Sequence, residues 1–322
     1  MTLLTDPTKY LQSIATYKHS ILDSYGYKKI LNDHYAPDEY LLFSDSHTLV
    51  PLVRKNDLVT FFGGTQHNHY NTFPLTPTGL KTVLEELTKN DLKFRLLSMT
   101  QDPMKILPPD FQKYDVPLPV TWIYKNIQSY DEAEYLAQLK GKKKWYMKRT
   151  IGKKNNYSFE KMDFADFRSV YQSILYKHNR YFRDRGKKSV WENNENLLLD
   201  ILEYFDTEEK LCIVTIQRLT IVGIYILVYN DNEMIYYFGT SLDYQDNEIS
   251  KILYLDMLEK ARDIARTYDI MDFDALPGGF SNKKRFLFFP VPLYGLVNDP
   301  DWVVKYDPEL TAEEYDRLLK RD

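Results

Sequence analysis

The sequence predicts an α/β chain of two similar units, each a mixed, mostly antiparallel sheet flanked by helices. Its 322 residues suit two domains of about 150 residues each. Both halves give the same order of segments, namely a helix, antiparallel strands, a second helix and a last strand. An apolar fraction of 43 % allows a sizeable core. We therefore expect one architecture used twice, with domains at residues 1–127 and 128–322.

The first half predicts a helical segment followed by a strand meander. One helix is expected from Pro7 to Asp33. Turn residues at 44–46 and 55–57 then separate short strand-like runs, as hairpin loops do. The elements expected up to residue 124 are strands at 40–44, 48–53, 58–62, 94–99 and 120–124 and a helix at 78–88. A proline-rich crossing at 103–119 joins the last two strands.

The second half begins with helices and continues as a second meander. Helices are expected at 131–138, 142–150, 164–183 and 194–205, and strands at 211–218, 221–229 and 234–239. In the helix that follows, Ile249, Leu253 and Met257 recur every three or four residues, so one apolar face packs on the sheet. The strand IMDFDA, the pair Gly278 and Gly279, a short helix and a last strand at 291–297 complete the chain.

Composition and charge exclude several classes of protein. The formal net charge of −4 argues against a dedicated nucleic-acid-binding protein, whose domain would be strongly basic. Cys212 is the only cysteine, which excludes an intrachain disulfide, and we expect it to be a buried small residue. No stretch approaches the ~18 uninterrupted apolar residues of a membrane span, and the first residues do not resemble a signal peptide. These features predict a cytoplasmic protein.

The stretch YYFGTSLDYQDNEIS, from Tyr236 to Ser250, joins a strand to a helix. The start of a helix leaves backbone N–H groups unpaired and carries a partial positive charge, which suits an anion. The pyrophosphate of an acyl-CoA could lie there, with Asn247 or Ser250 as the helix cap. The alternative is an ordinary strand-to-helix turn. The predicted donor site consists of Tyr237, Phe238, Gly239, Thr240, Ser250 and Lys251.

Four segments between about residues 131 and 286 carry a family resemblance. They are KKKWYMKRTIGKK, LYKHNRYFRDRGKKSVW, IVGIYILVYNDNEMIYYFGTSLDYQDNEIS and DFDALPGGFSNKKRF. This part of the chain resembles the acyltransferase domain of the GNAT superfamily in FemAB-like and BioF2-like (CelD/BcsL-type) proteins. The upstream stretch LLFSDSHTLVPLVRKNDLVTFFGGTQHNHYNTF is similar to the degenerate first unit of a tandem GNAT arrangement.

The resemblance implies transfer of an acyl group from a CoA-type thioester to an amine by direct attack. The acceptor would be a small-molecule or lipid-linked sugar or peptide, such as a cell-envelope precursor. One alternative is a Fem-like transferase that uses aminoacyl-tRNA as the donor, and another is a GNAT-fold protein that only binds. Residues 243–250 depart from the acetyl-CoA-binding pattern, because they contain three acidic residues and no glycine. Negative side chains there would repel a pyrophosphate.

Three residues are predicted to take part in catalysis. Asp274 follows a strand and could remove a proton from the attacking amine, although an aspartate before Pro277 could equally form a turn. Lys283 matches the basic element of the family and could hold an anionic substrate or the developing oxyanion. His178 lies in a long helix and could titrate near pH 7 as a base, or be a packed structural residue.

The remaining predictions concern the acceptor and a basic helix. We expect His67, Asn68, His69, Tyr70 and Arg285 to bind the acceptor, with the first four on a glycine-hinged loop. No metal is expected, because the two histidines of this loop lack an evident third ligand. A run of lysines and Arg149 between residues 140 and 154 includes Trp145 and Tyr146. It could bind phosphates of a lipid-linked sugar, a tRNA acceptor stem or a cofactor, or simply be a solvated helix face.

Overall fold

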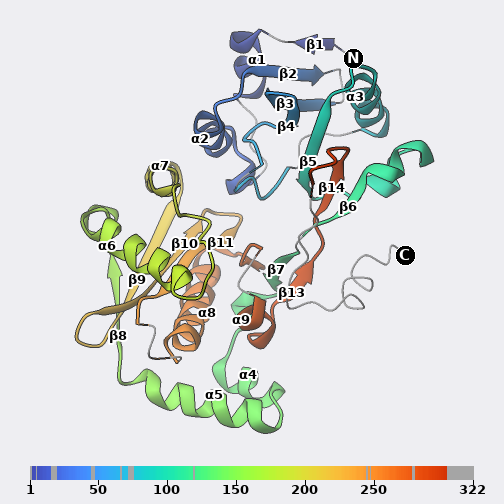
Figure 1. The fold of residues 1–322 in the computed structure, drawn as a ribbon. Coiled ribbons are helices and arrows are strands. Elements are labelled where there is room, and N and C mark those ends of the chain that lie inside the picture. The colour runs from blue at the N-terminus through green and yellow to red at the C-terminus, as the bar shows by residue number, and fades with distance from the viewer. Residues whose placement is uncertain are drawn as a thin grey trace. The chain divides into compact units, whose positions relative to one another are not determined.

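The computed structural model describes residues 2–4, 6–15, 20–44, 48–65, 67–71, 76–118, 120–243, 246, 248–277 and 280–302. These residues form two compact units, shown as ribbons in Figure 1. The first contains the chain up to Thr121 together with the described residues from Pro290, and the second runs from Trp122 to Phe289. Each unit has a mixed sheet flanked by helices, so the predicted α/β class with two such sheets is confirmed.

The sheet of the first unit has the strand order β1-β2-β3-β4-β5-β14-β6 among the described residues. Its strands are β1 (Thr2–Leu4), β2 (Glu39–Ser44), β3 (Leu49–Lys55), β4 (Leu58–Phe61), β5 (Lys93–Met99), β6 (Asp115–Pro117) and β14 (Tyr294–Val297). Its helices are α1 (Pro7–Ile14), α2 (Tyr25–Tyr35) and α3 (Pro77–Lys89), with short 3-10 helices η1 (Ile21–Asp23), η2 (Pro103–Lys105) and η3 (Pro109–Tyr114). The strands β4 and β5 are parallel, because α3 crosses over between them.

The sheet of the second unit has the order β13-β7-β12-β11-β10-β9-β8 in the described part of the chain. Its strands are β7 (Thr121–Tyr124), β8 (Ser158–Met162), β9 (Lys210–Gln217), β10 (Ile221–Tyr229), β11 (Met234–Ser241), β12 (Phe273–Asp274) and β13 (Phe289–Val291). Its helices are η4 (Ile127–Ser129), α4 (Glu132–Gln138), α5 (Gly141–Lys154), α6 (Phe164–Arg183), α7 (Glu195–Glu208), α8 (Ile249–Tyr268) and α9 (Phe280–Arg285). The strands β11 and β12 are parallel, and α8 crosses between them as α3 does in the first unit.

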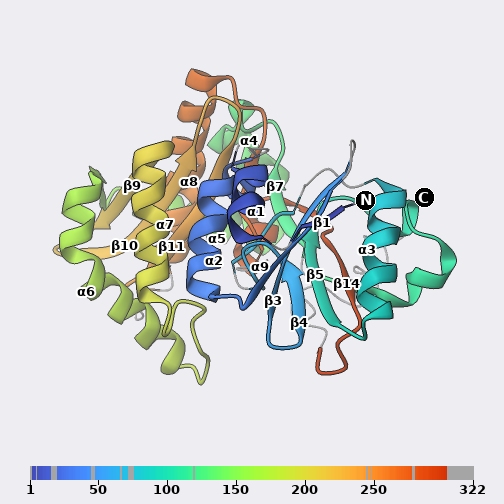
Figure 2. The same cartoon turned by 90° about the horizontal axis from the view of Figure 1, so that it is seen from above.

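Helices cover both faces of each sheet. In the first unit Leu41 and Phe43 pack with α3, whereas the intervening Leu42 packs with Tyr10 of α1. This alternation arises because successive side chains of a strand point to opposite faces. In the second unit α8 packs on β10 and β11, and α6 and α7 pack on β9. Figure 2 shows α7 and α8 on opposite sides of that sheet. Within the described residues, no helix combines the length and apolar character that crossing a membrane requires.

The first helix and the last strand differ from those expected. The single helix predicted from Pro7 to Asp33 is two helices, because Ser24 starts α2 by accepting the N–H of Tyr27. The last predicted strand is divided at Pro292, whose missing N–H interrupts a ladder. As a result β13 belongs to the second sheet and β14 to the first. The chain therefore passes from the first unit to the second after Thr121 rather than at residues 127–128, and the described residues from Pro290 to Trp302 belong to the first unit.

Candidate functional site

The strands β11 and β12 form a fork at the expected junction. Among the described residues they pair at two positions, the second of which sets Ile235 opposite Asp274. There β12 ends, whereas β11 continues to Ser241. The pairing of β11 with β10 skips Tyr237, which is the extra residue of a β-bulge. The fork lies directly before the predicted donor segment and the bulge lies within it, so β11 runs through this segment beyond the end of β12.

The side chains of this segment pack into the protein. Tyr237 and Phe238 are buried, and the Tyr237 ring meets Phe205 of α7 edge-on with centroids 5.1 Å apart. Gly239 lies beneath the ring of Tyr236, and a Cβ there would stand 2.1 Å from the Tyr236 hydroxyl. A ligand in the fork would therefore meet the backbone of β11 rather than the side chains of Tyr237 and Phe238.

His178 and Thr240 are brought together by a directed chain of hydrogen bonds. Nδ1 of His178 lies 3.0 Å from Oγ1 of Thr240, and Nε2 lies 3.0 Å from Oγ of Ser189. The Thr240 hydroxyl donates to the carbonyl of Ser241, and the Ser189 oxygen accepts the N–H of Trp191. Each hydroxyl then donates one hydrogen bond and accepts another if Nδ1–H donates to Thr240 and Nε2 accepts the hydroxyl proton of Ser189. The ring is held as one neutral tautomer.

Burial also keeps this ring uncharged. His178 is 7 % exposed, and its ring stands between Phe182 and Phe238 with centroids 5.0 and 5.3 Å away. Desolvation lowers the pKa of His178 to about 4. This corrects the expected titration near pH 7. The structure supports a positioning role for His178, which fixes Thr240 on β11.

The start of α8 is occupied by the chain's own carboxylates. A carboxylate oxygen of Asp246 accepts the N–H of Glu248, and its other oxygen accepts the Tyr157 hydroxyl at 2.6 Å. Glu248 is the N-cap residue of the helix and accepts hydrogen bonds from the Thr150 hydroxyl and from Nζ of Lys251, the latter at 3.2 Å. Negative charge at this end of a helix is stabilised by the helix dipole.

Both carboxyl groups are held ionised at this helix start. Burial alone would raise their pKa values, but hydrogen bonds from Tyr157 and Thr150 outweigh it, and the pKa values of Asp246 and Glu248 are lowered. Ser250 lies within the first turn of α8 and is not its cap. Asn247, the other expected cap, lies outside the described residues. The position predicted for a pyrophosphate is therefore taken by two anions.

Asp274 and Lys283 share one turn at the base of the fork. Oδ1 of Asp274 accepts the N–H of Leu276 at 2.7 Å, and Leu276 has a left-handed backbone with φ of 58°. Such a conformation is costly for a bulky residue and concentrates at functional sites. The buried ammonium of Lys283 donates to the carbonyls of Ala275 and Leu276. Lys283 therefore supports the Asp274 turn, while the side chain of Arg285 is exposed at the end of α9.

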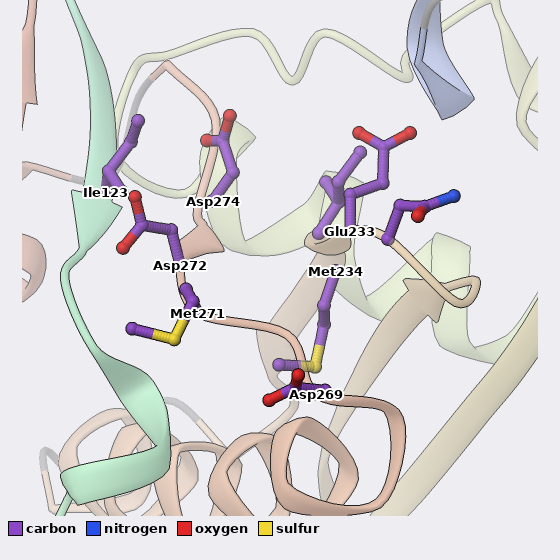
Figure 3. Close-up of a pocket in the computed structure, with 9 residues that line it drawn as sticks. Ile123, Glu233, Met234, Asp269, Met271, Asp272 and Asp274 are labelled. Atoms are coloured by element: carbon purple, nitrogen blue, oxygen red, sulfur yellow. The ribbon is translucent and has the colours of Figure 1, made fainter.

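An acidic pocket of about 380 Å³ adjoins Asp274. Its lining residues are Ile123, Asn232, Glu233, Met234, Ile235, Asp269, Met271, Asp272 and Asp274. Figure 3 shows Asp274 and Glu233 on the side of the pocket opposite Asp269. Asp272 is paired with Lys125 at 2.5 Å, and Asp269 accepts a hydrogen bond from Gln128 at 3.0 Å. The pocket therefore favours a cationic group beside Asp274.

The predicted acceptor loop is anchored by a buried lysine. Lys28 is 1 % exposed, forms an ion pair with Asp23 at 2.8 Å and donates to Oδ1 of Asn68 at 2.8 Å. The amide nitrogen of Asn68 donates to two carbonyls of the same loop. Asn68 therefore maintains the loop and is not exposed to a ligand. His67 and His69 are half-buried, with ring centroids 6.1 Å apart.

Tyr70, the fourth predicted loop residue, is also half-buried and shares a 2.9 Å hydrogen bond with the Thr121 hydroxyl. The described residues contain no group of three or more His, Cys, Asp or Glu side chains arranged to hold a metal ion. Cys212 is 4 % exposed, and burial raises the pKa of its thiol. Sequence reasoning missed Ser189 and Tyr157. The partner of Tyr157 is Asp246, 89 residues along the chain, and Ser189 reaches His178 only because the residues after α6 fold back onto that helix, so no periodic pattern indicated either contact.

Solved structures share this fold along nearly the whole chain. L-PGS from Bacillus licheniformis is 12 % identical with a TM-score of 0.53, and the match covers 98 % of each chain. FemX is 8 % identical with a TM-score of 0.52, covering 92 % of this chain and 97 % of FemX. A conserved protein of unknown function from Bacteroides thetaiotaomicron is 12 % identical with a TM-score of 0.55, covering 91 % and 96 %. No family model and no curated protein matches the chain. The chain thus shares its fold with FemX and L-PGS.

Proposed function

We propose that the protein is a transferase that moves an aminoacyl group from tRNA to an amine at the fork between β11 and β12. The observation that carries the proposal is the position of Asp274, which ends β12 where the strands separate and lines the acidic pocket. The backbone of β11 faces a donor on one side of this residue. The pocket receives the acceptor on the other.

The donor is inferred from the start of α8. A CoA thioester needs a site for its pyrophosphate, and the expected site holds the carboxylates of Asp246 and Glu248. These anions would repel a pyrophosphate at contact distance. An aminoacyl ester at the end of a tRNA does not require an anion site at that point. The Fem-like resemblance of the sequence implies the same donor.

The reaction proceeds by direct attack. The nitrogen of the acceptor amine forms a bond to the ester carbonyl carbon, and the bond from that carbon to the ribose oxygen breaks. Asp274 takes one proton from the attacking nitrogen and returns it to the ribose oxygen, which leaves as a hydroxyl. The acceptor would be an amine of a peptide or sugar in a cell-envelope precursor, as the resemblance implies. The acidic lining of the pocket would attract such an amine in its ammonium form, which must lose one proton to water before the neutral nitrogen attacks.

A transfer assay tests the proposal. Purified protein is given radiolabelled aminoacyl-tRNA or acetyl-CoA together with a peptidoglycan-precursor peptide, and label in the peptide is counted. We expect label from aminoacyl-tRNA. Asp274→Asn keeps the acceptor oxygen for the Leu276 N–H but removes the base, so it should lower turnover by about 10²-fold with an unchanged melting temperature. Label from acetyl-CoA alone would reject the donor. Full activity of the variant would reject Asp274 as the base.

A further inference from the structure

The helix α5 and the residue before it carry an unbalanced positive charge. Residues 140–154 contain eight cationic residues and no acidic one, in a chain whose net charge is −4. The cations are Lys140, Lys142, Lys143, Lys144, Lys148, Arg149, Lys153 and Lys154. Lys154 is paired with Glu259 of α8. Within the described residues, no ion pair involves the six cations from Lys140 to Arg149, most of which are exposed. A solvated face ordinarily mixes both signs of charge.

Two aromatic rings stand in the middle of this charge. Trp145 and Tyr146 are 57 % and 54 % exposed, and their centroids are 4.9 Å apart in an edge-to-face arrangement. The guanidinium of Arg149 lies 5.9 Å from the Trp145 centroid. The other tryptophans of the chain are buried or half-buried. Exposed rings among cations are how proteins that bind single-stranded nucleic acid hold the bases and the backbone together.

The opposite face of α5 fixes the helix beside α8. Met147 and Thr150 are buried, and the Thr150 hydroxyl donates to Glu248 at the start of α8. Lys154 binds Glu259 further along α8. Because α8 begins where the loop after β11 ends, an elongated ligand on α5 would lead toward the fork.

The chemistry of the surface favours RNA over a membrane. A helix that lies in a membrane interface inserts a broad apolar face. In α5 the aliphatic residues are Met147, which is buried, and Ile151, which is half-buried. Apart from two glycines, the exposed positions carry cations and two rings. The helix spans 14 residues, or roughly 21 Å, which is much longer than one pyrophosphate.

We propose that this exposed face of α5, from Lys140 to Arg149, is the docking surface for the RNA of the donor, with phosphates on the lysines and a base stacked on Trp145. The inference rests on the proposed function, because it assigns a surface to the tRNA that the proposal names. It predicts binding that weakens steeply with salt, since each neutralised phosphate releases counterions.

The test measures binding of deacylated tRNA by fluorescence anisotropy between about 50 and 200 mM salt. Lys143→Glu with Lys148→Glu should weaken binding at least tenfold at the lower salt and reduce the slope of log affinity against log salt by about 2. Lys105→Glu with Lys113→Glu changes the net charge equally at exposed positions of the first unit and serves as the control. Trp145→Ala should weaken binding about tenfold without changing the slope. The fluorescence of wild-type Trp145 should be quenched by tRNA.

Three results would overturn the inference. The α5 pair of substitutions could affect binding no more than the control pair does. The tRNA could leave the Trp145 fluorescence unchanged. The α5 variants could instead lose co-sedimentation with phosphatidylglycerol vesicles while their tRNA binding is intact, which would make α5 a membrane contact. The proposed function is tested separately, by label transfer from aminoacyl-tRNA in the wild type. If that transfer is observed, the proposed function stands even when one of these three results rejects α5 as the RNA surface. Loss of transfer in Asp274→Asn supports the proposed function and says nothing about α5.

Discussion

Replacing His178 with Gln should remove an acid-sensitive part of the protein's stability. The folded state holds this ring neutral between Thr240 and Ser189, and burial lowers its pKa to about 4. In the unfolded chain the ring would titrate near 6.5. Between these two values the unfolded state binds more protons than the folded state, so the free energy of unfolding falls as the pH falls. The contribution is present above about pH 6.5 and is lost progressively toward pH 4.

The size of the effect follows from the difference between the two pKa values. A difference of about 2.5 units corresponds to roughly 3.4 kcal/mol when the pH is below both values. At about pH 5 the expected loss is about 2 kcal/mol relative to about pH 7.5. Gln at position 178 does not titrate. The substitution also lowers the free energy of unfolding because Gln does not fill the space of the ring, but this loss is the same at both pH values.

Urea unfolding at about pH 7.5 and pH 5 measures the effect, with far-UV circular dichroism as the signal. The wild type should lose about 2 kcal/mol more between the two conditions than His178→Gln does. His34→Gln provides a matched control, since His34 lies on the exposed surface of α2. That variant should behave as the wild type. An equal loss in the wild type and in His178→Gln would refute the reasoning, because the buried ring would then titrate at its ordinary pKa.

Three further predictions concern other parts of the molecule. Lys28→Met should destabilise the first unit by about 3–5 kcal/mol because it leaves the buried Asp23 carboxylate without its cation, and adding Asp23→Asn should recover part of this loss in denaturant unfolding; no recovery would mean that the ion pair is not the cause. Gly239→Ala should cost about 1–3 kcal/mol because its Cβ meets the Tyr236 hydroxyl, and the cost should shrink in a Tyr236→Ala background; equal costs would exclude that clash. His69→Ala should raise the KM for the acceptor and leave donor binding intact in the transfer assay, and equal loss of both would argue against acceptor binding by the loop.

Elements with a strong local pattern could be predicted from the sequence. The three-or-four spacing of apolar residues identified α8, which runs from Ile249 to Tyr268. The strand β10 coincides with the predicted range 221–229. By contrast, β8 at Ser158–Met162 was not expected, because it is the last strand of its sheet and none of its residues is buried. A strand without buried side chains leaves little hydrophobic periodicity to detect.

The candidate site was predicted less completely than the fold. The junction between strand and helix could be located, and the acidic residues of 243–250 already argued against a pyrophosphate. The bulge at Tyr237 could not be foreseen, because it depends on the register between β11 and β10. The neutral state of His178 depends on hydroxyl groups 11 and 62 residues away. Such contacts are set by tertiary packing, which a single sequence does not display.

The position of β14 has a consequence for the synthesis of the protein. In the first sheet Leu96 of β5 is paired with Leu296 of β14, which leaves the ribosome 200 residues later. At about 5–20 residues per second, this delay is about 10–40 s. Throughout that time β5 lacks one neighbour and presents an unpaired edge, which is a site for pairing with other nascent chains. The first unit is therefore completed only after the second unit has been synthesised. A nascent chain that ends before β14 lacks the strand that joins β5 to β6 in the first sheet.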